Sequence, residues 1–207
     1  NLVKKVSFAD PSISVPVKLN PERFAQNPER MEAARFKLKT LENIDVYDKF
    51  ENICQLNINR IESLKDVYSN GITSDIISND ARSLTKEIGS TEILQDESVD
   101  LILTSPPYAG AQKYIRSSWL NLYWLGTKNS EDIRLLNKQN IGREDYHKAD
   151  MFRVSTNIQA ADDVLTSLYD EGKNERAFIV GNYLNEMKSA IDESVRVLKT
   201  GGYMIIV

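Results

Sequence analysis

Residues 98–108 have the sequence SVDLILTSPPY, an apolar run followed by a small polar residue, two prolines and an aromatic residue. The run from Val99 to Thr104 predicts a strand, and Pro106-Pro107 ends it because proline has no N–H to donate to a sheet. In open α/β sheets, ligands bind at the carboxyl ends of the strands. We therefore expect Ser105 to Tyr108 to lie at a functional site.

The remainder of the chain predicts helices that alternate with short strands. Apolar residues recur every three or four positions in the longer helical stretches, and glycine or proline ends several of them. We expect helices over residues 28–40, 48–68, 114–125, 131–138, 157–169 and 174–198, and further strands over residues 75–78 and 203–207. Strands separated by helices, without hairpin signals, predict an α/β fold with a parallel sheet. We divide the chain into an extended arm (1–28), a helical segment (29–70) and a catalytic part (71–207).

The composition limits the classes of function. The chain has 207 residues, a net charge of −4, one cysteine and one histidine. One cysteine cannot form an internal disulfide, and one cysteine with one histidine cannot build a Cys/His zinc site. We therefore expect a protein of the reducing cytoplasm whose chemistry uses no protein-held metal. No apolar run approaches the length that spans a membrane, so we expect no membrane partner.

Three motifs, in order along the chain, carry a resemblance to a known family. The sequence TSPPY at residues 104–108 resembles the (Asp/Asn/Ser)-Pro-Pro-(Tyr/Phe) motif of S-adenosylmethionine-dependent DNA amino-methyltransferases. Residues 78–84 resemble the acidic segment that lies upstream in this family, and RVLKTGG at residues 196–202 resembles the end of its following helix. The resemblance implies a Rossmann-like methyltransferase sheet with helices on its faces, here with an N-terminal helical segment. The serine form of the motif favours cytosine N4 over adenine N6 as the methylated atom.

The resemblance also implies a role for each matching residue. The catalytic segment would consist of Ser105, Pro106, Pro107 and Tyr108. The Ser105 hydroxyl and the Pro106 carbonyl would accept the hydrogens of the target amino group, and Tyr108 would stack on a base flipped out of double-stranded DNA. Asp80 and Ala81 would contact the cofactor, S-adenosylmethionine. The residues themselves leave a second interpretation of Asp80 open, as the N-cap of a helix that begins at Ala81.

A local excess of positive charge follows the motif. Residues 112–153 contain eight Lys and Arg against five Asp and Glu, in a chain that is negative overall. Such a basic lip suits contacts to DNA phosphates. We assign Lys113, Tyr114 and Arg116 to nucleic-acid contact, with a solvated surface as the alternative for the two cations.

One feature of the family is missing. The chain contains no Gly-x-Gly, whereas the family holds the methionyl part of its cofactor with a Phe-x-Gly-x-Gly loop. We therefore expect this chain to be part of a methyltransferase, from a restriction-modification system or an orphan methylase, with a possible partner subunit. Two alternatives stay open: an amino-methyltransferase for RNA or protein glutamine, and a non-catalytic methyltransferase-like module that binds DNA or a partner.

Overall fold

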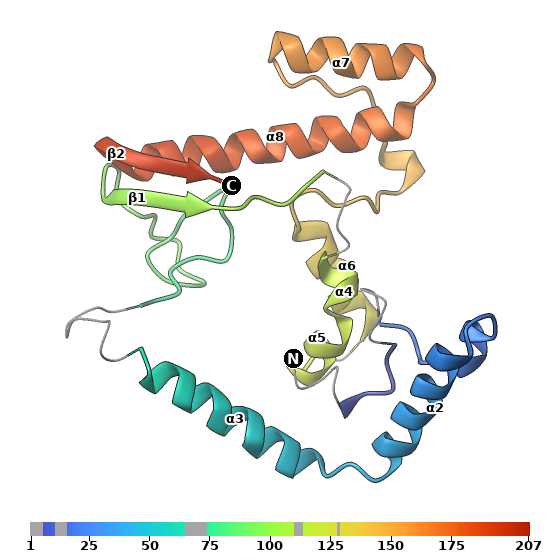
Figure 1. Cartoon of the computed structure of the whole chain (residues 1–207). Coiled ribbons are helices and arrows are strands. Elements are labelled where there is room, and N and C mark those ends of the chain that lie inside the picture. Colours follow the sequence, from blue (N-terminus) through green and yellow to red (C-terminus); the bar gives the residue numbers. More distant parts are fainter. Residues whose placement is uncertain (1–5, 11–15, 65–73, 110–113, 128) are drawn as a thin grey trace. The chain divides into compact units, whose positions relative to one another are not determined.

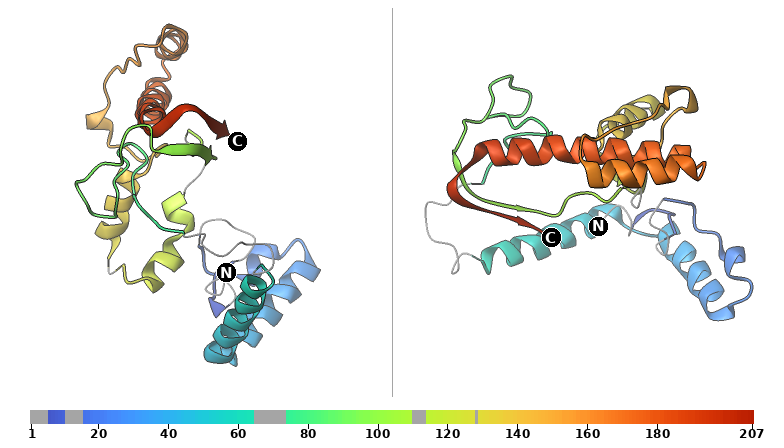
Figure 2. Two further views of the ribbon diagram at one scale, coloured as in Figure 1. Left: turned by 90° about the vertical axis from the view of Figure 1, so that its left-hand side faces the viewer. Right: turned by 90° about the horizontal axis from the view of Figure 1, so that it is seen from above.

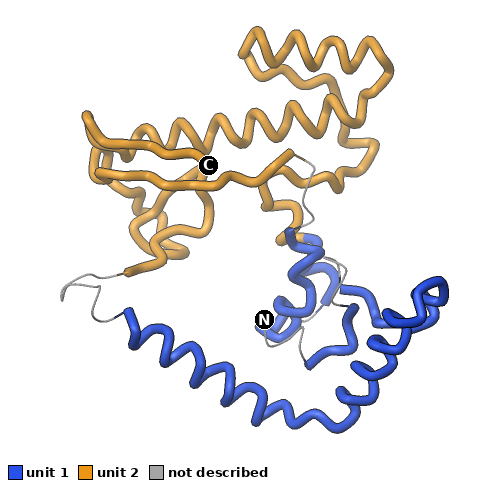
Figure 3. The backbone as a smooth tube through the Cα atoms, viewed as in Figure 1, with its two compact units in different colours: residues 1–73, 114–134 blue, residues 74–113, 135–207 orange. Residues whose placement is uncertain are grey.

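The computed structural model describes residues 6–10, 16–64, 74–109, 114–127 and 129–207. The chain divides into two compact units (Figure 3): unit 1 combines residues 1–73 with 114–134, and unit 2 combines residues 74–113 with 135–207. The sequence predicts that residues 114–134 belong to the catalytic part, whereas in the structure they group with the helical segment.

Unit 1 starts with short, locally capped helices. The 3-10 helix η1 (Pro21–Phe24) and the helix α2 (Pro28–Glu42) each begin at a proline that follows an asparagine. The side chains of Asn20 and Asn27 accept hydrogen bonds from backbone N–H groups two and three residues further on, so both N-termini are capped. The buried apolar side chains around α2 are Leu19, Ala34 and Leu41.

The remaining helices of unit 1 bury little surface. Helix α3 (Val46–Glu62) has the expected amphipathic spacing, but none of its residues is buried. Asp45 caps α3 by accepting two backbone hydrogen bonds from its first turn, at 2.9 and 3.0 Å. The single helix expected over residues 114–125 is interrupted, and forms α4 (Tyr114–Ser117) and α5 (Trp119–Trp124).

Unit 2 contains a two-stranded parallel sheet. Strand β1 (Val99–Thr104) pairs with β2 (Leu198–Ile206), and residues 101–104 lie opposite residues 203–206 (Figure 1). Because side chains alternate along a strand, one face of the sheet carries the apolar residues Leu101, Leu103, Tyr203 and Ile205, which are between 48% and 73% exposed. The mixed α/β class and the parallel pairing are therefore confirmed.

The strand expected over residues 75–78 does not form. Residues 74–78 have no regular secondary structure, and neither β1 nor β2 pairs with them. A short apolar run becomes a strand only when a neighbouring strand satisfies its backbone groups, and within the described part of the chain no strand pairs with this run. The prediction was therefore wrong at this position.

Two glycines allow β2 to begin beside β1. Gly201 has a φ of +83°, in the left-handed region that favours glycine. A Cβ on Gly202 would lie 2.9 Å from the backbone carbonyl oxygen of Asp100, so only glycine lets the two strands approach here. The sequence predicts that Gly201-Gly202 ends a helix, whereas in the structure both residues lie inside β2, at an irregularity in the register.

Helices α7 (Gln159–Asp170) and α8 (Asn174–Val197) lie side by side in both views of Figure 2. Leu165 of α7 is 2% exposed and packs against Gly181 of α8, where an added Cβ would lie 3.2 Å from the Leu165 Cδ1. Phe178 of α8, 3% exposed, packs edge-on against the rings of Tyr146 and Phe152. Helix α8 runs directly into β2, so it fixes the start of the second strand. The shorter elements are α6 (Ser130–Gln139), close to its predicted bounds, and the 3-10 helix η2 (Lys148–Asp150).

Across the described ranges, no helix combines the length and the apolar character that a membrane crossing requires.

Candidate functional site

The Ser-Pro-Pro-Tyr segment lies at the carboxyl end of β1, where the sequence places it. The backbone N–H of Val207 donates to the carbonyl oxygen of Thr104, at 3.0 Å, which extends the pairing of the two strands up to the motif. Ser105 and Tyr108 are exposed, whereas the two prolines between them are half-buried. The stiff Pro-Pro turn thus presents a hydroxyl and an aromatic ring at its two ends.

A polar cavity of about 360 Å³ adjoins the motif. Its lining comes from three separate segments, namely Asn79, Asp80 and Ala81, then Pro107, and then Gln139, Asn140 and Ile141. The structure therefore brings the two predicted cofactor residues next to one residue of the predicted catalytic segment. We call this space the polar cavity.

The carboxylate of Asp80 is held by Arg82. Its Oδ1 accepts hydrogen bonds from the backbone N–H and the Nε of Arg82, both at 2.9 Å, and its Oδ2 accepts one from an Arg82 terminal nitrogen at 2.9 Å. The side-chain hydrogen bonds from Arg82, followed by its backbone N–H, lower the pKa of Asp80 below its ordinary value, and partial burial opposes this shift. Residues 80–83 form a turn, closed by a hydrogen bond from the Ser83 N–H to the Asp80 carbonyl oxygen at 3.2 Å, so Asp80 caps a turn and no helix begins there.

The guanidinium of Arg82 also contacts helix α8 and the last residue of α6. Arg82 lies 3.3 Å from Oε1 of Glu186 and donates to the carbonyl oxygen of Gln139 at 3.1 Å. Glu186 accepts a further hydrogen bond from the backbone N–H of Gly142, at 3.3 Å, through its other oxygen. Two walls of the polar cavity are therefore tied to α8 through one arginine and one glutamate.

Gly142 also brings its loop close to the catalytic segment. Its φ is +77°, and a Cβ there would lie 3.1 Å from the carbonyl oxygen of Tyr108 and 3.3 Å from the Tyr183 ring. A larger residue would therefore be strained and crowded at this position. The close approach fixes the loop of residues 139–142 against the end of the motif.

A second ion pair anchors the segment between Asp80 and β1. Glu193 accepts a hydrogen bond from the backbone N–H of Leu84 at 2.8 Å, and Arg196 donates to the carbonyl oxygen of Leu94 at 2.7 Å. Hydrogen bonds from the Arg196 guanidinium lower the pKa of Glu193, with a smaller contribution from the Leu84 N–H. Arg196 opens the RVLKTGG motif, so this motif has a structural role here.

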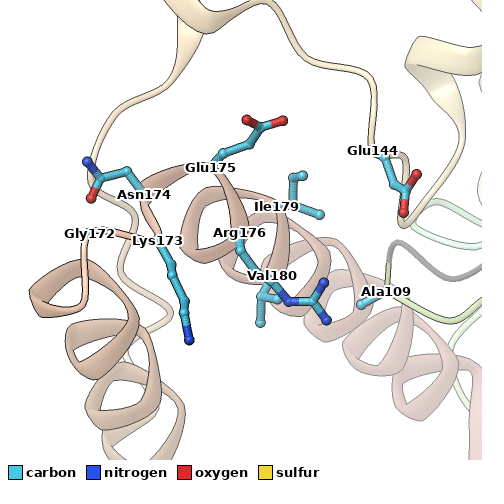
Figure 4. Close-up of a pocket in the computed structure, with 9 residues that line it drawn as sticks. All are labelled: Ala109, Glu144, Gly172, Lys173, Asn174, Glu175, Arg176, Ile179 and Val180. Atoms are coloured by element: carbon cyan, nitrogen blue, oxygen red, sulfur yellow. The ribbon is translucent and has the colours of Figure 1, made fainter.

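A larger cavity, of about 560 Å³, lies at the start of α8 (Figure 4). Its charged lining residues are Lys173, Arg176, Glu144 and Glu175. Figure 4 shows the Arg176 guanidinium pointing toward Ala109, the residue that follows Tyr108. The two positive and two negative charges balance, so the lining does not favour an anionic ligand.

The predicted nucleic-acid residues fall outside this arrangement. Lys113 lies outside the described residues. Tyr114 and Arg116 belong to unit 1, whereas the motif and the polar cavity belong to unit 2. The Arg116 guanidinium lies 5.8 Å from the centre of the Trp119 ring, a cation–π contact within unit 1. Their assignment to nucleic acid stays a prediction.

Sequence reasoning missed the C-terminal residue of α6 and the loop that follows it. Gln139, Asn140 and Ile141 line the polar cavity, yet in the sequence they read only as a helix end followed by a turn. The single available signal was Gly142, a glycine directly after a predicted helix and its turn. Arg82 and Glu186 were missed because these two residues, which contact each other, are 104 positions apart in the sequence.

Among the described residues, no group of three or more His, Cys, Asp or Glu side chains is arranged to hold a metal ion. Comparisons with protein-family models, with curated proteins and with solved structures found no match to this chain.

Proposed function

We propose that this chain is the motif-bearing part of an S-adenosylmethionine-dependent DNA methyltransferase that acts on an exocyclic amino group, with cytosine N4 favoured over adenine N6. The observation that carries the proposal is the juxtaposition of Pro107 with Asp80 and Ala81 around the polar cavity. These residues belong to two motifs that were matched to the family independently, and they are 26 or more positions apart in the sequence.

The lining of the polar cavity suits the adenosine end of the cofactor. Its volume of about 360 Å³ lies within the range of about 300–1,000 Å³ that small-molecule sites occupy. A carboxylate, held ionised by Arg82, and the side-chain amides of Asn79, Gln139 and Asn140 supply acceptors and donors for an aminopurine and a ribose. The cofactor supplies a methyl group bound to a positively charged sulfur.

The residues of the motif then have distinct tasks. An exocyclic amino nitrogen is a poor nucleophile because its lone pair is delocalised into the ring. The Ser105 hydroxyl and the Pro106 carbonyl would accept its two hydrogens and turn its lone pair out of the ring plane. The methyl carbon would pass from the cofactor's sulfonium, which would become a neutral thioether, to this nitrogen, and the nitrogen would release a proton to water. Positioning and electrostatics are then the chain's contributions to rate.

Two further features support the proposal. Tyr108 is 57% exposed, which leaves area on the ring for a flipped base. The apolar sheet face of Leu101, Leu103, Tyr203 and Ile205 corresponds to the face that a second helical layer covers in a doubly wound sheet. We therefore also propose that the sheet is a Rossmann-like methyltransferase sheet, which is incomplete in this chain.

The test is methyl transfer from isotopically labelled S-adenosylmethionine to DNA, followed by nucleoside analysis. We expect label in N4-methylcytosine. Label in N6-methyladenine would refute the cytosine assignment and keep the enzyme class. Label in RNA or in protein glutamine, and none in DNA, would favour the second enzyme class. No transfer to any of these substrates, together with retained DNA or partner binding, would identify a non-catalytic module.

A further inference from the structure

Arg82 joins three segments that the polar cavity depends on. Its side chain contacts the carboxylate of Asp80, the carbonyl oxygen of Gln139 and the carboxylate of Glu186. The Arg82 side chain is 25% exposed and that of Glu186 is 22% exposed, so water screens these contacts only in part. Glu186 closes the arrangement by accepting from the N–H of Gly142.

The Asp80 carboxylate can accept a hydrogen bond from a ligand in addition to those from Arg82. Three hydrogens of Arg82 bind this carboxylate: the backbone N–H on Oδ1, the Nε–H shared between Oδ1 at 2.9 Å and Oδ2 at 3.2 Å, and a terminal N–H on Oδ2. The Asp80 side chain nevertheless remains 40% exposed and lines the cavity, so its exposed edge can accept a further hydrogen bond from a ligand. An ionised carboxylate can only accept hydrogen bonds, which makes it selective for a ligand edge that carries a donor, such as an amino group.

We propose that Arg82 and Glu186 are positioning residues that orient the Asp80 carboxylate toward the polar cavity and thereby select ligands with an exocyclic amino group over ligands with an oxo group. The inference rests on the proposed function for the identity of the ligand, an adenosine-containing cofactor. Arg82 acts through Asp80, and Glu186 acts through Arg82 and the loop at Gly142. Neither is assigned a contact with the ligand.

These contacts require the planar guanidinium group of an arginine. Arginine binds the Asp80 carboxylate through two nitrogens and still reaches Glu186 with a third, whereas the single ammonium of lysine offers one point of contact. Arg82→Lys therefore keeps the charge and removes the orientation. Glu186→Gln keeps the shape and removes the charge that holds the guanidinium.

The experiment measures binding of S-adenosylhomocysteine and of S-inosylhomocysteine, its oxo analogue, by isothermal titration calorimetry. The variants are Arg82→Lys and Glu186→Gln. Asp192→Asn is the matched control, because Asp192 lies on the same helix in an exposed ion pair with Lys188. Loss of one charge-assisted hydrogen bond corresponds to about a tenfold change in Kd or more. We expect wild type and control to bind S-adenosylhomocysteine more tightly than S-inosylhomocysteine. In both variants the ratio of the two Kd values should fall by at least about tenfold.

Each outcome has a distinct meaning. Unchanged preference in Arg82→Lys and Glu186→Gln would overturn the positioning role and leave the proposed function standing. An equal loss of affinity for both ligands, with a lower melting temperature, would show a purely structural role and would also overturn it. If wild type binds neither ligand, the cofactor assignment fails, and the positioning role falls with it.

Discussion

Helix α3 in unit 1 and helix α8 in unit 2 form by opposite means. Asp45 caps α3 with two hydrogen bonds, yet no residue of α3 is buried. The N-cap of α8 is Lys173, whose side chain makes no capping bond, yet α8 buries five residues along its length. Local signals are therefore sufficient to start a helix, whereas burial is what holds a helix in register with distant segments.

Among the described residues, both units contain local ion pairs, but the pairs with the largest sequence separation differ between them. In unit 1, Arg35 pairs with Glu22 and Arg134 pairs with Glu131, both short connections along the chain. In unit 2, the contact of Arg82 with Glu186 spans 104 residues. Charged side chains in unit 2 thus fix loops around a cavity. This contrast is the reason to look for function in unit 2 first.

The largest expected effect comes from changing side chains of the Ser-Pro-Pro-Tyr segment in unit 2. Ser105→Ala deletes the hydroxyl that we expect to accept an amino hydrogen, and Tyr108→Ala deletes the stacking ring. Because each group would act on the reacting base, we expect methyl transfer to fall by about 100-fold or more in either variant. Tyr47→Ala, an aromatic control on α3 that is 86% exposed, should keep the wild-type rate. Comparable losses in the control would place function in unit 1.

A pair of core substitutions compares the two units in stability. Leu165 is 2% exposed between α7 and α8, whereas Phe50 on α3 is 55% exposed. Leu165→Ala should lower the free energy of unfolding by about 2–5 kcal/mol, because it leaves a cavity. Phe50→Ala should cost less than about 1 kcal/mol. Chemical denaturation followed by circular dichroism measures both. A larger cost at Phe50 would show that the face of α3 is covered in solution.

Acid should weaken unit 2 through its paired carboxylates. The pKa of Glu193 is lowered by Arg196, and that of Asp80 is lowered by Arg82. A carboxyl whose folded pKa is depressed stabilises the fold above its unfolded pKa, about 4 for both types, and this contribution is lost as the pH falls through the folded value. We expect the melting temperature to drop as the pH falls below about 4. Glu193→Gln should have a lower melting temperature at pH 7 and a smaller further drop in acid. An unchanged acid response in this variant would contradict the assignment.

The elements predicted from the sequence were those with strong local or periodic signals. The bounds of α2, α7 and α8 were predicted to within about two residues, and so was the start of β1. The run at residues 75–78 was mispredicted, because a strand depends on a partner that the local sequence does not contain. Contacts between remote segments likewise limited the prediction of the site residues. Asp80 and Ala81, which line the polar cavity, were predicted by their motif, whereas Arg82 and Glu186 are defined by contacts between remote segments.

The smallest effect expected concerns the two helix N-termini. Asp45→Ala removes the cap of α3, and caps of this type contribute about 0.5–2 kcal/mol. Since α3 has no buried residue to compensate, its helix should fray, and circular dichroism at 222 nm should fall slightly at pH 7. Lys173→Ala on α8 removes no capping bond and should leave the signal unchanged. Equal losses in both variants would mean that α8 also depends on its first turn, and that burial is not what distinguishes the two helices.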